Sequence, residues 1–205
     1  MILVGMTGGS GSGKSTVATE MRRKHIPVID CDELYHSLIS GASPCTEALI
    51  ARFGKGVENE EGGINRTALS RIVFEQSEEG RRALADLNEI THGHVTDALS
   101  KILSELEAKG ETVSVLDAPT LIESGIYKRC DFVIAVYADK ETCLARIMTR
   151  DGMSHEAASM RIASQKPRSY YAEYADFIIE NKGSEAQLLS EADKVLKLIL
   201  REVKS

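Results

Sequence analysis

Short, strongly apolar segments alternate with longer amphipathic segments along this chain of 205 residues. The short segments are rich in valine, isoleucine and leucine, and they show no alternation with polar residues. This pattern is typical of strands that are buried on both faces, as in a parallel sheet. The predicted strands are residues 2–6, 26–29, 112–117, 132–137 and 177–179.

The amphipathic segments repeat apolar residues at the spacing of an α-helix. Ser77, Ser154 and Ser184 precede three of them as N-caps, and Gly110 follows the longest as a C-terminal glycine. Inside that longest segment, residues 91–94 (Thr-His-Gly-His) predict a kink or break. Residues 54–66 predict a polar surface loop with a tight hairpin. The predicted helices are residues 16–24, 33–40, 46–53, 65–74, 78–109, 140–150, 155–165 and 185–200.

Five apolar strands that alternate with helices predict an α/β fold, in which a five-stranded parallel sheet has helices on both faces. Crossover connections between parallel strands are right-handed, so the sheet should be doubly wound. In such sheets, ligands bind at the carboxyl ends of the strands. Residues that follow a predicted strand are therefore the first candidates for a functional site.

A glycine-rich loop follows the first strand and precedes the first helix. It has the spacing Gly8-x4-Gly13-Lys14-Ser15, which is that of a phosphate-binding P-loop. Its backbone N–H groups and the helix N-terminus would bind phosphate oxygens, with Lys14 on the β- and γ-phosphates and Ser15 on Mg²⁺. We expect a P-loop nucleoside-triphosphate hydrolase-like fold. The expected ATP-binding residues of the loop are Gly9, Gly11, Ser12, Gly13, Lys14, Ser15 and Thr16.

Composition and charge narrow the class of protein. Hydrophobic residues make up 42% and charged residues 27%, as in a globular domain, and the length suits a single domain with an inserted subdomain. The net charge of −6 and the scarcity of aromatic residues argue against a nucleic-acid partner. No apolar stretch is long enough to span a membrane. Four cysteines without zinc-ligand spacing predict free thiols and a cytoplasmic protein. We expect no obligate protein partner.

Several classes of P-loop protein lack their further motifs here. The guanine-reading Asn-Lys-x-Asp tetrad of GTPases is absent, and the third strand ends in a single acid, Asp117, where larger ATPases usually have two. A small-molecule kinase instead needs a carboxylate near the acceptor hydroxyl. Asp32, after the second strand, is the candidate for that base, although it could also serve as the N-cap of the next helix.

A small-molecule kinase also needs arginines on a lid over the phosphates. Arg146 and Arg150 are four residues apart on one predicted helix, and Arg161 lies on the next. Each arginine taken alone could also be a solvated surface residue, but the clustering favours a functional role for Arg146 and Arg150. Two further candidates stay open as well. Asp117 could act near Mg²⁺, bind the acceptor or cap a turn, and His92 could line a substrate pocket or cap the chain.

Several stretches together resemble the dephospho-coenzyme A kinase family. The resemblance extends from the first strand to about Gly183. It consists of the P-loop from Thr7, Val28-Ile-Asp-Cys-Asp32, Arg66-x-x-Leu69, Leu87-Asn-x-Ile-x-His92, Asp117-x-Pro-x-Leu-x-Glu123, Arg146-x-x-x-Arg150-Asp151, Arg161, Gln165 and Asn181-x-Gly183. The chain departs from the family pattern at Gly93, Thr120, Ile122 and Cys31. Of these, Gly93, Thr120 and Ile122 bear on the shape of the acceptor pocket.

The resemblance implies transfer of the γ-phosphoryl group of ATP, with Mg²⁺, to the ribose 3′-hydroxyl of dephospho-coenzyme A, the last step of coenzyme A biosynthesis. It implies catalytic roles for Asp32, Lys14 and Arg146, and it adds Arg146, Arg150 and Asn181 to the ATP site. The acceptor-binding residues would be Asp32, His92, Asp117, Leu121 and Arg161.

The resemblance also implies how the single domain is divided. Its core would be residues 1–32, 111–145 and 175–205, with a helical acceptor-binding subdomain at 33–110 and a lid at 146–174. The alternatives are another P-loop small-molecule kinase, acting on a nucleoside or nucleotide, and a nucleotide-dependent binding protein without catalysis.

Overall fold

The computed structural model describes residues 1–202, and the chain divides into two compact units. The first, which we call the sheet unit, comprises Met1–Ile29 and the chain from Glu111 onward. The second, the helical unit, comprises Asp30–Gly110. Within the described part of the chain, no helix combines the length and apolar character that crossing a bilayer requires.

The five predicted strands form one parallel sheet in the order β2-β3-β1-β4-β5, which confirms the predicted fold class. Neighbours in register include Val4 with Val115 across β1 and β3, and Gly5 with Val133 across β1 and β4. Every residue of β1 is buried, as the unbroken apolar pattern predicts. The strands are β1 (Ile2–Thr7), β2 (Val28–Asp30), β3 (Val113–Asp117), β4 (Phe132–Tyr137) and β5 (Phe177–Glu180).

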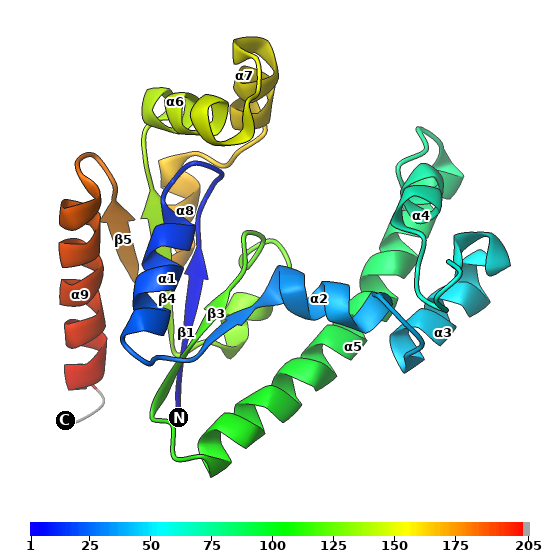
Figure 1. Ribbon diagram of the computed structural model, residues 1–205, viewed down its shortest axis with the longest axis horizontal. Helices are drawn as coiled ribbons and strands as arrows, with labels where there is room; N and C mark the ends of the chain where they lie inside the picture. The colour runs from blue at the N-terminus through cyan, green and yellow to red at the C-terminus, as the bar shows by residue number, and fades with distance from the viewer. Residues whose placement is uncertain (203–205) are drawn as a thin grey trace. The chain divides into compact units, whose positions relative to one another are not determined.

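Helices cover both faces of this sheet (Figure 1). On one face, α1 (Lys14–Arg23) and α9 (Glu185–Glu202) bury apolar side chains such as Val17 and Leu188 against the strands. On the other, Tyr171 of α8 (Arg168–Tyr174) packs with Ile122 and Ala135. Before α9, the hydroxyl of Ser184 accepts a bond from Gln187 N, and Ser184 N donates in return to Oε1 of Gln187. These two bonds form a capping box.

Two helices, α6 (Lys140–Asp151) and α7 (His155–Ala163), stand beyond the carboxyl ends of the strands (Figure 1). They pack on each other through a small apolar cluster that includes Ile147 and Ile162. Gly152, at φ +63°, ends α6 in the left-handed conformation that glycine adopts readily. This short turn keeps the arginines of the two helices close to each other.

The helical unit has its own apolar core, which includes Leu49, Leu69 and Val73. A backbone bridge between Glu58 and Ile64 forms the tight hairpin that the polar loop predicts. The unit contains α2 (Cys31–Ile39), α3 (Pro44–Phe53), a 3-10 turn at Lys55–Val57, α4 (Arg66–Val73) and α5 (Glu78–Ala108).

Of the kink or break predicted at residues 91–94, the break is wrong, because α5 runs continuously from Glu78 to Ala108. A mid-helix glycine costs only about 1 kcal/mol, which tertiary packing readily offsets. Here α5 packs against α2, α3 and α4, and the buried Thr91 bonds back to Leu87 O within the helix.

Helix α8 is absent from the predicted elements. Its seven residues include three tyrosines, a poor helix former, so its sequence carries little helical signal. The burial of Tyr171 against the sheet and the position of Pro167 just before the helix account for it.

Candidate active site

The P-loop connects β1 to α1 and takes a conformation that depends on its glycines. Gly11 and Gly13 have φ angles of +81° and +99°, which strain any residue with a Cβ. At Gly13, a Cβ would also lie 2.3 Å from Nδ2 of Asn181. The loop closes on itself through a bond from Ser12 N to Gly9 O (3.1 Å), and Thr16 N and Val17 N bond to Gly13 O at the start of α1. The predicted strand, loop and helix are therefore present.

Lys14, the first residue of α1, forms an ion pair with Asp117, the last residue of β3. The Lys14 ammonium donates to Oδ1 of Asp117, and the two side chains are only 14% and 5% exposed. Parallel neighbouring strands bring their carboxyl ends together, which is why residues 103 positions apart meet here. Asp117 thus places a compensating negative charge beside the P-loop lysine.

Arg146 and Asn181 bind backbone carbonyl groups of the P-loop. Arg146 donates from Nη1 to Gly11 O and from Nη2 to Oδ1 of Asn181, both at 3.2 Å. Asn181, which is 4% exposed, donates from Nδ2 to Ser12 O at 2.8 Å. Two successive carbonyls of the loop are therefore bound by side chains from α6 and from the end of β5.

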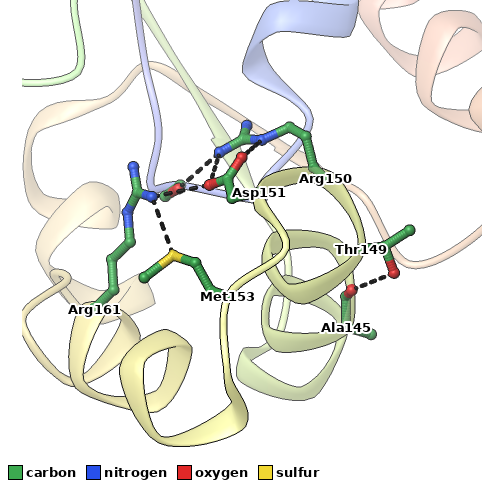
Figure 2. Close-up of polar contacts among 7 residues, drawn as sticks. Ala145, Thr149, Arg150, Asp151, Met153 and Arg161 are labelled. Carbon is green, nitrogen blue, oxygen red and sulfur yellow. Dashed lines mark hydrogen bonds and ion pairs between the residues drawn. The ribbon is translucent and has the colours of Figure 1, made fainter.

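Arg150 and Arg161 share one carboxylate, that of Asp151 (Figure 2). Arg150 bonds to it with Nε and Nη2 (2.6 and 2.8 Å), and Arg161 bonds with Nη1 (2.9 Å). Nη2 of Arg150 also reaches Oγ of Ser10 in the P-loop at 3.5 Å. The hydrogen bond with Arg150 holds the pKa of Asp151 below its usual range and raises the pKa of Arg150. Both guanidinium groups thus converge on one anionic group, which here is the carboxylate of Asp151.

Asp151 and Gln165 are absent from the candidate residues named above, although both belong to quoted motifs. Gln165 donates from Nε2 to Ser10 O at 3.3 Å. Its side chain lies so close to the loop that a Cβ on Gly9 would be 2.1 Å from Oε1. The four-residue spacing from Arg161 to Gln165 is the sequence signal that could have identified it.

In the helical unit, Asp32 lies exposed in the first turn of α2. The N-cap of that helix is Asp30, whose Oδ1 accepts bonds from the backbone N–H groups of Asp32 and Glu33 (2.9 and 3.1 Å). The alternative that Asp32 is the N-cap is therefore wrong. Since Asp30 does the capping, the Asp32 carboxylate is not needed for it.

His92 is an exposed residue within the continuous helix α5, so the idea that it caps a break is wrong as well. Leu121, a predicted acceptor contact, is fully buried and approaches Gly5 of β1 within the sheet unit. This burial supports a packing role for Leu121 and offers no direct contact with a substrate.

The helical unit carries a groove of about 680 Å³ that no sequence motif indicates. Polar groups and apolar side chains both face it. The lining residues include Arg66, Tyr35, Thr67 and Ser70, which carry polar groups, and the apolar Val73, Phe74 and Leu87. Such a surface suits an elongated ligand with an anionic part and an apolar part.

The residues around the P-loop fit a Mg²⁺ ion that binds mainly through substrate phosphates and water. Ser15 presents an exposed hydroxyl in the first turn of α1. Among residues 1–202, no group of three or more His, Cys, Asp or Glu side chains could hold a metal alone. Mg²⁺ commonly takes few protein ligands beside a nucleotide, so this donor set agrees with it.

Comparison with known proteins gives the family. The model of the family described as dephospho-CoA kinase matches residues 2–187. The chain belongs to the dephospho-CoA kinase family. A family member from Halalkalibacterium halodurans is 39% identical over 183 residues, which are 89% of each chain. A member from Corynebacterium efficiens is 32% identical over 204 residues and the full length of both chains.

Solved structures agree with this assignment. The dephospho-CoA kinase from Campylobacter jejuni has a TM-score of 0.70 and 30% identity, with 96% of each chain covered. TT1252 from Thermus thermophilus has a TM-score of 0.78 and 33% identity, covering 98% of this chain and 97% of its own. Shikimate kinase from Acinetobacter baumannii, at 16% identity and a TM-score of 0.51, covers 98% and 94% of the two chains and shares the fold alone.

Proposed function

We propose that this protein transfers the γ-phosphoryl group of ATP to the ribose 3′-hydroxyl of dephospho-coenzyme A, giving coenzyme A and ADP. The observation that carries the proposal is the extent of the family match, which runs over residues 2–187 and so includes the P-loop of the sheet unit and the whole helical unit. A P-loop alone would support only nucleotide binding.

ATP would bind by its phosphates at the P-loop, where the glycines leave backbone N–H groups accessible and the N-terminus of α1 favours negative charge. Lys14 would move from Asp117 to the β- and γ-phosphates. Arg146 and Arg150 would stabilise the charge of the transferring group. The contacts of both arginines with loop residues Gly11 and Ser10 support this role.

Mg²⁺ would be held by Ser15 and the phosphates, and when bound it would neutralise charge on the β- and γ-phosphate oxygens. Asp117, once Lys14 leaves it, would supply a carboxylate for the ion's water shell or for the acceptor. Ser12 has a buried hydroxyl with no partner among the described residues, which fits a loop whose ligand completes its hydrogen bonds.

Asp32 would orient or deprotonate the 3′-hydroxyl so that it attacks phosphorus in line. The capping of α2 by Asp30, which leaves Asp32 to other uses, supports this assignment. We also propose that residues 33–110 bind the acceptor, with His92 among its contacts and the groove at Arg66 holding its non-reacting anionic arm. Residues 146–174, which include Arg161, would form the lid.

We further propose a cytoplasmic location, since none of the four cysteines forms a disulfide bond, as is usual in a reducing compartment. Small-molecule substrates are sufficient partners for the reaction, and the acidic net charge of −6 gives no support for nucleic acid.

A panel of acceptors tests the proposal. Purified protein is incubated with ATP and Mg²⁺ and either dephospho-coenzyme A, adenosine, AMP or shikimate, and the products are identified by mass and by NMR. We expect phosphorylation of dephospho-coenzyme A at its 3′ position. Turnover of a different acceptor alone would identify another small-molecule kinase. Nucleotide binding without turnover of any acceptor would identify a binding protein.

A further inference from the structure

Asn181 is a buried polar residue, and both ends of its side-chain amide bind protein groups. Its Oδ1 accepts from Arg146 Nη2 at 3.2 Å, and its Nδ2 donates to Ser12 O at 2.8 Å. Its backbone N–H bonds to Tyr137 O at 2.7 Å, so the end of β4 fixes its main chain as well. With 4% exposure, the side chain has little surface left for a nucleotide.

The bond from Asn181 to Ser12 O also sets the direction of the Gly13 N–H, which lies on the opposite side of the same peptide unit. In a planar trans peptide unit, the C=O and the next N–H point in opposite directions. When Asn181 holds the carbonyl of Ser12, it therefore also directs the N–H of Gly13 away from itself. That N–H belongs to the row that a P-loop offers to phosphate. The next carbonyl back, Gly11 O, is bound in the same way by Arg146.

The packing around Gly13 leaves no room for a side chain at this position. A Cβ on Gly13 would lie 2.3 Å from Asn181 Nδ2 and 3.0 Å from Leu188. The side-chain amide of Asn181 thus packs directly against Gly13, whose φ is +99°. A buried amide that is hydrogen-bonded at both its oxygen and its nitrogen favours one geometry, because a displacement would break one of these bonds.

We infer that Asn181 is a positioning residue of the phosphoryl-donor site, which aims the Gly13 N–H and the Arg146 guanidinium and does not itself bind ATP. This assignment rests on the proposed function only for the identity of the nucleotide. It differs from the expectation that Asn181 contacts ATP directly.

Asn181→Asp separates the two contacts. The new carboxylate keeps an oxygen for Arg146, but it turns an acceptor towards Ser12 O, where a donor is needed. We expect the dissociation constant for ATP, measured by calorimetry without acceptor, to rise about tenfold or more. Asn59→Ala is the matched control, since the Asn59 side chain also holds a loop, by bonds from Glu61 N and Gly63 N, but in the helical unit. It should lower the melting temperature and leave ATP affinity unchanged.

A double-mutant cycle gives a readout that a merely structural role would not move. If Asn181 acts through Arg146, the loss of ATP affinity in the Asn181→Ala, Arg146→Ala double variant falls short of the product of the single losses by about fivefold or more. Losses that multiply within about twofold would overturn the inference. So would wild-type affinity in Asn181→Asp.

The wild type provides a test that does not depend on variants folding. In its ATP complex, the side-chain amide of Asn181 should stay bound to Ser12 O and exchange its protons as slowly as in the free protein. A direct bond from that amide to the nucleotide would refute a positioning role. These measurements use ATP alone. Failure to phosphorylate dephospho-coenzyme A would therefore refute the proposed function, while the test of Asn181 would still give a result.

Discussion

The pair of Lys14 and Asp117 puts two opposite charges in a largely buried place. Removing one partner of such a pair leaves the other charge uncompensated, which commonly costs about 3 kcal/mol or more. Burying the charge of Lys14 beside the P-loop costs free energy, and the opposite charge of Asp117 offsets this cost. This accounts for an acidic residue beside a site that binds anions.

Lys14→Met should lower the free energy of unfolding by about 3 kcal/mol and reduce turnover by about 10²-fold or more. Adding Asp117→Asn should restore most of the stability, because it removes the buried charge that has lost Lys14, and should restore none of the turnover. Urea unfolding and ADP release measure the two effects. Recovery of activity in the double variant would show that Lys14 has no role on the phosphates.

Asp32→Asn should reduce turnover of dephospho-coenzyme A by about 10²-fold or more and leave ATP affinity unchanged, since a general base acts on the acceptor only. Glu33→Gln is a close control, because Glu33 is the next residue, is also exposed and carries the same charge. Equal losses in both variants would argue for a general charge effect in place of a base.

At the scale of elements, the pattern of the chain predicts most of what positions the site. All five strands follow from it, because apolar runs and parallel burial go together. Helix α8 is missed, and the break predicted within α5 is absent, since in both places tertiary packing decides against local propensity. The predicted helix starts at Ser77 and Ser154 are confirmed by their bonds to Gly80 N and Ala157 N.

Gly93→Ala tests the continuity of α5. Gly93 lies in the helix interior, and a Cβ there would meet nothing within 4 Å. Alanine should therefore raise the free energy of unfolding by about 1 kcal/mol, the usual difference in helix propensity. Urea unfolding of the two proteins gives the value. A destabilised variant would indicate that the helix is broken at this position after all.

At the scale of the whole molecule, residue types and spacings predict the site better than they predict its contacts. The P-loop, Arg146 and Arg150 can be found from sequence because glycine spacing and helical periodicity are local signals. The bond from Asn181 to Ser12 joins residues that are far apart in the sequence. The bonds from Asp151 to two arginines are made between side chains. No local pattern shows which partner such a side chain takes.

Asp193 ties α9 to the end of α1, and its carboxylate provides a pH-dependent contribution to stability. Hydrogen bonds from Lys24 and then from Lys197 lower the pKa of Asp193 to about 2. A lowered folded-state pKa stabilises the fold above the unfolded value of about 4, and this contribution is lost as the pH falls towards about 2. The melting temperature of Asp193→Asn should lie below that of the wild type at about pH 6, and the gap should close towards about pH 2. A gap that does not change with pH would contradict this account.

The central claim is that one chain joins a P-loop phosphoryl donor site to an acceptor site for dephospho-coenzyme A. The most direct test is the rate of ADP release by the wild type with ATP and Mg²⁺, measured with and without dephospho-coenzyme A. The account predicts that ADP appears in step with the 3′-phosphorylated product and at a rate at least about 10²-fold higher when the acceptor is present. ADP release that is the same with and without dephospho-coenzyme A would contradict it.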